Sequence, residues 1–151
     1  MGLRRRSREK ALQVMYSMEF NHMNSRDEAL DDYYTFYNLP GHCPDADFDA
    51  EERVFVKYLL DEVATNIRVI ESLIEKAAIN WRMDRIAYIE RNILRLSVAE
   101  LLDDKNGIPF KATINEAIDI AKKFGNKESS SFVNGIINKV AEMIDVKMKK
   151  L

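Results

Sequence analysis

Apolar residues recur along most of this chain at intervals of three or four positions, the spacing that places them on one face of an α-helix. They do not alternate with polar residues, as they would in a half-buried strand. Only three prolines and five glycines occur in 151 residues, so long stretches contain no strong helix breaker. The pattern predicts an all-α fold.

The N-terminal third is predicted to contain two helices. In the first, Leu12 and Met15 belong to an apolar stripe. The second is expected over residues 27–38, with Ser25 as its N-cap and Glu28 completing a capping box. Its four aromatic residues are Tyr33, Tyr34, Phe36 and Tyr37. Their helical spacing beside an acidic run favours core packing over base stacking.

The middle of the chain is predicted to contain a central helix. Apolar residues continue over residues 51–81, which is too long for one ordinary globular helix, so a break is expected near Thr65-Asn66. Asp84 is the expected cap of the next helix. The apolar residues of segment 86–102 leave little polar face, which is typical of a helix surrounded by others. This helix is predicted to be the hub of the core and to end before residues 106–109.

A further helix is predicted after a capping box formed by Thr113 and Glu116. Its apolar stripe ends at Gly125, the expected C′ residue. Lys122 and Lys123 lie at its C-terminus, where positive charge is favourable with the helix dipole. Capping of the helix and binding of an anion are equally consistent with this placement.

The last helix is predicted to begin at about Glu128. Its apolar residues step by four from Phe132 to Ile144. Gly135 lies inside this pattern, where glycine costs about 1 kcal/mol relative to alanine. The glycine therefore suggests a close helix crossing at this position.

Size and composition predict one soluble globular domain over residues 1–151. No apolar run approaches the ~20 residues needed to span a bilayer, and no apolar h-region follows the basic N-terminus. The single cysteine, Cys43, suits a reducing compartment. We therefore expect a cytoplasmic protein that does not bind a membrane.

Charge is distributed unevenly, although the formal net charge is only -2. Residues 1–20 contain five Lys/Arg and two Glu, a local net of +3, and residues 21–50 carry a net of -6. Positive charge at a helix N-terminus is unfavourable with the helix dipole by a few tenths of a kcal/mol, roughly, for each residue. Helix stability therefore does not explain the arginines, and an external anion explains them better.

The sequence contains no pattern of a catalytic, cofactor or metal site. Its glycines form neither a dinucleotide-binding nor a phosphate-binding loop, and its two histidines lack the context of a general base. The carboxylates of residues 45–49 resemble the start of a calcium loop, but Ala50 replaces the required glycine and Val56 the bidentate glutamate. His42 and Cys43 have no second pair with which to hold zinc. We predict a protein without enzymatic activity, cofactor or metal.

Four motifs occur in order along the chain. They are Arg4-Arg5-Arg6-x-Arg8-Glu9-x-Ala11-x-Gln13-x-Met15-Tyr16, Ile114-Asn115-Glu116-Ala117-Ile118, Lys122-x-Phe124-Gly125 and Phe132-Val133-Asn134-Gly135. In this combination the chain resembles the NusB family of bacterial transcription antitermination factors over essentially its whole length. The resemblance implies about seven helices in two small packed bundles around a central apolar helix.

The resemblance also implies a function and partners. NusB-like proteins bind the single-stranded boxA element of ribosomal RNA operon transcripts together with NusE, a small-subunit ribosomal protein. With the other Nus factors, this complex helps RNA polymerase resist termination. The implied RNA-binding residues are Arg4, Arg5, Arg6, Arg8, Gln13, Lys111, Lys123 and Phe132. Glu90 matches a family glutamate on the side that would bind NusE.

Two functions of other classes stay open at the level of sequence. A helical adaptor that binds only proteins would use the aromatic-rich and central helices and leave the basic start as a solubilising tail. A regulator that binds DNA would use the same arginines, but it needs a recognition helix with base-reading side chains, and none is evident.

Overall fold

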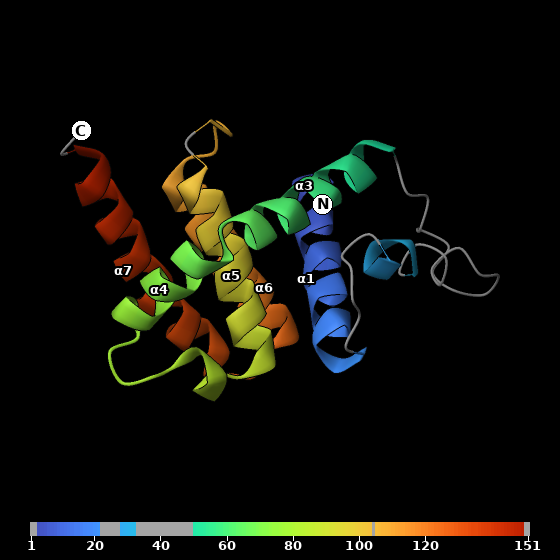
Figure 1. The fold of residues 1–151 in the computed structure, drawn as a ribbon. Helices are drawn as coiled ribbons and strands as arrows, with labels where there is room; N and C mark the ends of the chain where they lie inside the picture. Colours follow the sequence, from blue (N-terminus) through green and yellow to red (C-terminus); the bar gives the residue numbers. More distant parts are fainter. Residues whose placement is uncertain (1–2, 22–27, 33–49, 104, 150–151) are drawn as a thin grey trace. The chain divides into compact units, whose positions relative to one another are not determined.

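The computed structural model describes residues 3–21, 28–32, 50–103 and 105–149, and every regular element in these ranges is helical (Figure 1). The predicted all-α fold is confirmed. The elements are α1 (Leu3–Asn21), a helical segment at residues 28–32, α3 (Ala50–Thr65), α4 (Ile67–Ala77), the 3-10 helix η1 (Met83–Arg85), α5 (Tyr88–Leu102), α6 (Phe110–Phe124) and α7 (Ser129–Lys149). None of these helices is both long and apolar enough to pass through a bilayer.

The chain divides into two compact units, residues 1–61 and residues 62–151. Unit 1 contains α1, the helical segment at 28–32 and most of α3. Unit 2 contains the end of α3, then α4, η1, α5, α6 and α7. Two units agree with the two bundles that the resemblance implies, and one domain over the whole chain stays a prediction.

Several predictions fall on residues outside the described ranges. They concern the N-cap Ser25, the second helix beyond residue 32 with its aromatic cluster, His42, Cys43 and the carboxylates of residues 45–49. In the described part of the second helix, residues 28–32 are helical and Ala29 and Leu30 are buried.

The predicted break near Thr65-Asn66 is confirmed, because α3 ends at Thr65 and α4 begins at Ile67. Asn66 has φ -108° and ψ 16°, which lies outside the helical region. Its side-chain amide donates to the Glu62 carbonyl oxygen at 3.1 Å, and its own carbonyl oxygen accepts from the Ile70 N–H at 2.9 Å. Asn66 is therefore hydrogen-bonded to the helices on both sides of the bend.

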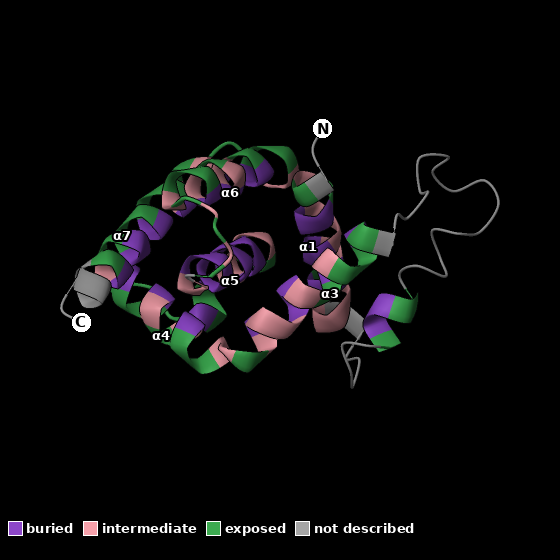
Figure 2. Cartoon of the chain, turned by 90° about the horizontal axis from the view of Figure 1, so that it is seen from above, coloured by how far each residue is buried: buried purple, intermediate pink, exposed green. Residues whose placement is uncertain are grey.

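The predicted central helix is confirmed as α5. Nine of its 15 residues are buried, and it packs against α4, α6 and α7. Figure 2 shows α5 coloured largely as buried, with these three helices around it. Each large aliphatic side chain buried in this way contributes roughly 1.5–3 kcal/mol through the hydrophobic effect. The core of unit 2 is therefore organised around α5.

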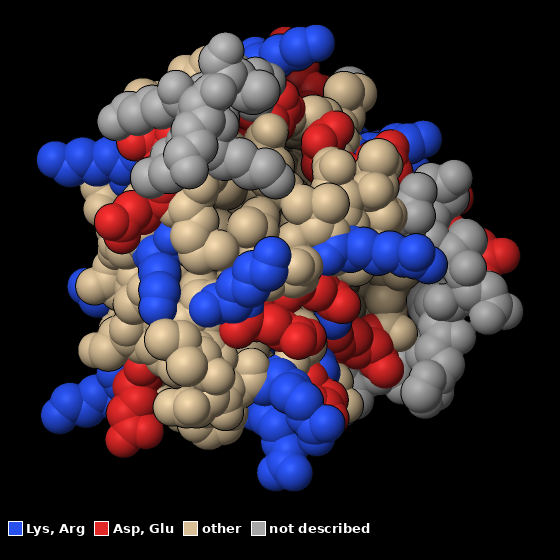
Figure 3. Space-filling view, turned by 60° about the vertical axis from the view of Figure 1, so that its left-hand side comes forward, with Lys and Arg blue, Asp and Glu red and all other residues tan. Residues whose placement is uncertain are grey.

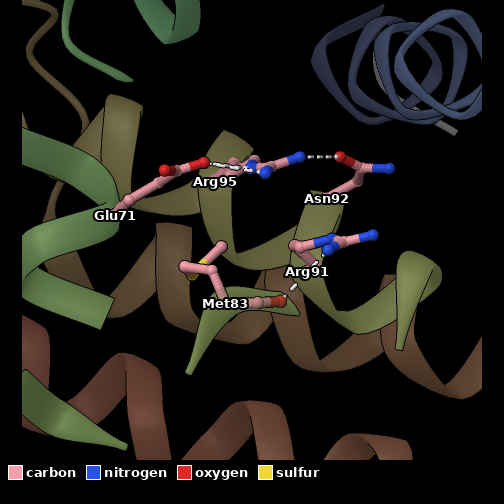
Figure 4. A network of polar contacts seen from close by, with 5 residues as sticks. All are labelled: Glu71, Met83, Arg91, Asn92 and Arg95. Atoms are coloured by element: carbon pink, nitrogen blue, oxygen red, sulfur yellow. Dashed lines mark hydrogen bonds and ion pairs between the residues drawn. The ribbon is translucent and has the colours of Figure 1, made fainter. Parts of the chain in front are cut away.

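Two arginines of α5 hold the elements that precede it (Figure 4). Arg95 donates to Glu71 Oε1 on α4 from Nε at 3.1 Å and from Nη2 at 2.7 Å, and to Asn92 Oδ1 from Nη1 at 3.1 Å. Arg91 Nη1 donates to the carbonyl oxygen of Met83 in η1 at 3.1 Å. Charge-assisted bonds from a planar guanidinium constrain direction as well as distance. The positions of α4 and η1 are thereby tied to the central helix.

The last two helices end and begin close to the predicted residues. α6 ends at Phe124, directly before Gly125, and α7 begins at Ser129, one residue after the predicted start. Gly125 has φ -97°, so it terminates α6 without the left-handed conformation of a typical C′ glycine. The apolar stripe of α7 is buried at Val133, Ile136, Ile137, Val140 and Ile144.

Three local predictions are wrong. Asp84 does not cap α5, because it lies in η1 and Ala87 is the residue that precedes the helix. Thr113 does not cap α6, because the helix begins directly after Pro109 and Thr113 is buried inside its first turn. Pro109 is the N-cap, with φ -61° and ψ 144°, so the helix begins four residues earlier than predicted. Gly135 does not mark a close helix crossing, since a Cβ placed there would meet no atom within 4 Å.

Candidate nucleic-acid interface

Arg4 lies at the exposed start of α1. Its guanidinium carbon is 5.9 Å from the centroid of the Phe55 ring on α3. A cation at about this distance is attracted to the face of an aromatic ring. The Phe55 ring in turn stacks on Tyr58, with the ring centroids 5.7 Å apart. Arg4 is therefore oriented by α3 while its charge stays at the surface, and Arg5 beside it is half-buried.

Two cations of the basic start share one internal counter-ion, Glu52 of α3. The Glu52 side chain is 1% exposed; Lys10 Nζ donates to its Oε1, and Arg6 Nη2 lies 3.6 Å from its Oε2. The Arg6 side chain is 46% exposed, whereas that of Lys10 is 16% exposed. A buried carboxylate needs such partners, because an uncompensated buried charge costs several kcal/mol, roughly 3–5. Arg6 thus pairs with Glu52 on one side, while nearly half of its side chain stays accessible to a ligand at the surface.

Arg8 lies on the buried side of α1, with 5% of its surface exposed. It precedes Leu12 by four residues, which places both on the same helix face. Gln13 is half-buried. The predicted RNA-binding residues of α1 therefore differ in accessibility, and Arg4 and Arg6 are the exposed pair.

Lys111 and Lys123 are both exposed but lie near opposite ends of α6. The rise of an α-helix separates them by about 18 Å along the axis. Lys123 Nζ is 5.5 Å from the centroid of the Phe124 ring. Phe132 lies in the first turn of α7, just beyond the connection that follows Phe124. Lys123 and Phe132 thus flank the same connection, whereas Lys111 lies at the far end of the helix.

The connection between α6 and α7 is a tightly packed turn. Asn126 Oδ1 accepts from the N–H groups of Glu128 and Ser129, at 2.9 Å and 3.1 Å, as the acceptor at the start of a helix does. Ser129 Oγ accepts from the Asn126 N–H at 3.0 Å. A Cβ at Gly125 would lie 2.5 Å from Ser129 Cβ and 2.8 Å from the Ala121 carbonyl oxygen. Packing against Ser129 therefore requires glycine at position 125.

Glu90, the predicted partner-binding residue, lies in the first turn of α5 and is half-buried. Its Oε1 accepts a hydrogen bond from Ser129 Oγ at 2.9 Å. Ser129 is 1% exposed, so this bond is shielded from water. Glu90 therefore fixes the first turn of α7, from which Phe132 extends.

Trp81 is the residue at this site that the sequence pattern does not single out. It follows α4, and its ring meets the Phe132 ring edge to face, with centroids 6.1 Å apart and planes at 81°. Trp81 is also 50% exposed. The available signal in the sequence is weak: the single tryptophan of the chain is followed by Arg82 and Arg85 and not by a run of apolar residues.

The charges on one face of the molecule are mixed in sign. On the face shown in Figure 3, Lys and Arg side chains alternate with Asp and Glu side chains and with uncharged areas. On this face a polyanion would meet individual cations and not a uniform positive field. In the described ranges, no group of three or more His, Cys, Asp or Glu residues has the arrangement of a metal site.

The comparison with known families decides the identity of this fold. The model of the NusB family matches residues 5–142, which is most of the chain. The chain belongs to the NusB family. The resemblance inferred from the four motifs is therefore confirmed, and NusB is a family of transcription factors and not of enzymes.

Relatives of this NusB-family chain match it over nearly their whole length. The transcription antitermination protein NusB of Myxococcus xanthus (strain DK1622) is 40% identical over 141 residues, which are 93% of this chain and 96% of that protein. The solved structure of T. maritima NusB is 31% identical, with a TM-score of 0.78 over 92% of this chain and 90% of that one. A crystal structure of the antitermination factors NusB and NusE in complex with dsRNA is 27% identical, with a TM-score of 0.79 over 95% and 98%. The shared fold extends to a family member crystallised with a protein partner and RNA.

The individual contacts of this NusB-family chain stay predictions. The RNA-binding residues divide into those of α1 in unit 1 and Lys111, Lys123 and Phe132 in unit 2. Within unit 2, the structure brings Phe132 together with Trp81 and ties its helix to Glu90.

Proposed function

We propose that this NusB-family protein binds single-stranded boxA-type RNA of ribosomal RNA operon transcripts jointly with NusE. In that complex, with the other Nus factors, it helps RNA polymerase resist termination in the cytoplasm. The observation that carries the proposal is the exposed pair Arg4 and Arg6 at the start of α1, in a family whose members are named for antitermination. A related structure that contains NusB, NusE and RNA supports the choice of partners.

The arginines of α1 are suited to phosphate groups. A guanidinium binds phosphate through two parallel hydrogen bonds and keeps its charge at every physiological pH. If Arg4, Arg5 and Arg6 each neutralise one phosphate, log affinity falls with log salt with a slope of about -2 for a single strand. Arg8 is buried, so we expect it to orient the helix and not to add a fourth contact.

Phe132 is suited to a base. Its ring lies at the start of α7 and is fixed by Trp81, and aromatic rings of this kind stack on bases that are splayed out of a single strand. The related complex contains double-stranded RNA. In a duplex the base faces are covered by their neighbours, so a site that stacks bases favours the unpaired form.

NusE is proposed to bind on the side of unit 2 that includes Glu90. Because Glu90 accepts the Ser129 hydrogen bond, its contribution would combine direct contact with positioning of α7. The Ser129 bond leaves the second carboxylate oxygen of Glu90 as a further acceptor.

A binding titration tests the proposal. Fluorescently labelled boxA-like RNA and a scrambled RNA of the same length are titrated with the protein, with and without NusE, at several salt concentrations. We expect preference for the boxA-like RNA, tighter binding with NusE and a salt slope near -2. Equal binding of both RNAs, or a slope near zero, would refute it. Binding of NusE without any binding of RNA would favour the protein adaptor instead.

A further inference from the structure

The connection after α4 exposes two large apolar side chains. Ile79 is 74% exposed and Trp81 is 50% exposed. A tryptophan side chain offers roughly 150–250 Å² of surface when it is fully covered. Figure 1 shows this connection at the same end of unit 2 as the first half of α7. The exposed indole is therefore placed beside Phe132, which the proposed function assigns to a base.

The Trp81 ring is held in place before any ligand arrives. Its backbone N–H donates to the Ala78 carbonyl oxygen at 2.8 Å, and its ring is fixed edge to face against Phe132. The following turn is tied to the core, because Arg91 donates to the Met83 carbonyl oxygen at 3.1 Å. A group that is already ordered loses little conformational entropy on binding.

Trp81 lines two open hollows. One has a volume of about 320 Å³ and is lined by residues of the connection and of α7, including Ile79, Phe132 and Gly135. The other has a volume of about 560 Å³ and is lined by Asn80, Trp81, Arg82 and Arg85. Both volumes fall in the range of small-ligand sites, roughly 300–1,000 Å³.

Gly135 contributes to the first hollow by having no side chain. A Cβ there would meet no atom within 4 Å, so the residue is not required by packing in the folded chain. Glycine inside a helix nevertheless costs about 1 kcal/mol relative to alanine. A close helix crossing does not explain Gly135. Space for a ligand beside Phe132 does explain it.

The second hollow carries positive charge next to the indole. Arg82 and Arg85 are exposed, and Arg82 Nε lies 3.5 Å from Asp84 Oδ1. Both side chains of this pair are more than two-thirds exposed, at 71% and 67%, so their attraction is weak. A phosphate can therefore replace Asp84 as the partner of Arg82. Two arginines beside an aromatic face suit a nucleotide, whose base stacks and whose phosphate accepts bidentate hydrogen bonds.

We propose that Trp81 stacks on an unpaired base of the RNA strand and that Arg82 and Arg85 bind the adjoining phosphate. The inference rests on the proposed function, which supplies the RNA, and adds a second base contact next to that of Phe132. A nucleotide fits the two hollows better than a protein side chain does, because a protein anchor is typically enclosed by apolar surface and shielded from water.

Trp81 provides its own signal for the test, since it is the only tryptophan in the chain. The full-length protein is titrated with boxA-like single-stranded RNA, and the emission of Trp81 and the anisotropy of labelled RNA are followed in parallel. We expect the emission to be quenched at the same RNA concentration at which the anisotropy rises. Binding by anisotropy with unchanged emission overturns the inference and leaves the proposed function standing.

Variants separate stacking from stability. Trp81→Ala is expected to weaken RNA binding roughly 5- to 150-fold, the range for loss of one stacked base, and Trp81→Phe to retain most of the affinity. Val69→Ala removes another exposed apolar side chain, 51% exposed on α4, and is expected to change the affinity less than twofold, on the order of a surface substitution. Circular dichroism establishes that each variant is folded.

Three results would overturn the inference. Trp81→Ala could bind RNA as tightly as Val69→Ala, or it could lose NusE binding while RNA binding is retained, which would make this surface a protein interface. The third result is that the wild-type protein shows no anisotropy change with any RNA, which would refute the proposed function as well.

Discussion

Replacement of Glu52 by glutamine isolates the competition between an internal carboxylate and RNA phosphates for Arg6. Glu52 is buried on α3 and pairs with both Arg6 and Lys10. Glutamine keeps the size of the side chain and one acceptor oxygen, but it removes the negative charge and replaces the second acceptor oxygen with an NH2 donor. We predict that Glu52→Gln binds boxA-like RNA more tightly and is at the same time less stable.

The two effects can be sized from the structure. At the 3.6 Å separation of Arg6 and Glu52, the attraction is about 4–5 kcal/mol at an effective dielectric constant of 20, before desolvation. Because Arg6 is 46% exposed, screening reduces the net value to about 0.5–1 kcal/mol. RNA affinity should therefore rise roughly 2- to 5-fold. Lys10 is mostly buried and loses the negative charge of Glu52, which should lower the free energy of unfolding by about 1–3 kcal/mol.

The assay combines RNA titration with thermal unfolding. Glu51→Gln is the matched control, since it removes the same charge from the neighbouring, exposed position of α3. Glu51→Gln should show any effect of net charge on RNA affinity and stability, but it leaves the pairs of Glu52 with Arg6 and Lys10 intact. Equal RNA affinity of the two variants would show that Glu52 does not restrain Arg6. An unchanged midpoint of unfolding for Glu52→Gln would show that the Lys10 pair contributes nothing to stability.

Three further substitutions, two of them paired with a control variant, test the connection between α6 and α7 and the base contact. Gly125→Ala should destabilise the protein by about 1–3 kcal/mol in thermal unfolding, because its Cβ meets Ser129. Gly135→Ala, whose Cβ meets no atom, should be neutral or stabilising by up to about 1 kcal/mol. Similar melting of the two variants would contradict the claim that packing against Ser129 requires glycine at position 125. Ser129→Ala removes the buried hydroxyl that bonds the half-buried Glu90 carboxylate and the Asn126 N–H, and it should cost about 1–3 kcal/mol, with Ser72→Ala on the exposed face of α4 as the control. Phe132→Ala should weaken boxA binding by roughly 1–3 kcal/mol in an anisotropy titration, and full retention would place the base elsewhere.

Features encoded within one helix were predictable from the sequence. The break near Thr65-Asn66 follows from the length of an apolar run that exceeds one globular helix, and the structure has α3 and α4 on its two sides. The central position of α5 follows from its nearly complete apolar surface. Both depend on periodicity, which is a local property of the chain.

Features that depend on neighbours were not predictable. A Ser/Thr-x-x-Glu pattern looks the same at a helix start and one turn inside it. The pattern therefore predicts a helix start at Thr113, whereas the N-cap is Pro109. Gly125 and Gly135 are both glycines in helical surroundings, but only the first is crowded by another side chain. Their roles follow from packing between separate helices, which one sequence does not display.

The candidate site divides in the same way. The basic start of α1 was visible as charge, whereas the burial of Arg8 and the pairing of Arg6 with Glu52 depend on which helix face is covered. Trp81 and Phe132 are 51 positions apart in the sequence and come together only through the packing of unit 2. The sequence therefore indicated which residue types carry the site, and the fold selects among them.

The most direct test of the central claim compares single-stranded with double-stranded RNA of the same boxA sequence. Affinities of the protein with NusE for the single strand and for the strand annealed to its complement are measured at one salt concentration. We predict that the single strand binds at least about fivefold more tightly, because a duplex denies the aromatic residues at least one stacked base, worth roughly 1–3 kcal/mol. Equal or tighter binding of the duplex would contradict recognition through unpaired bases.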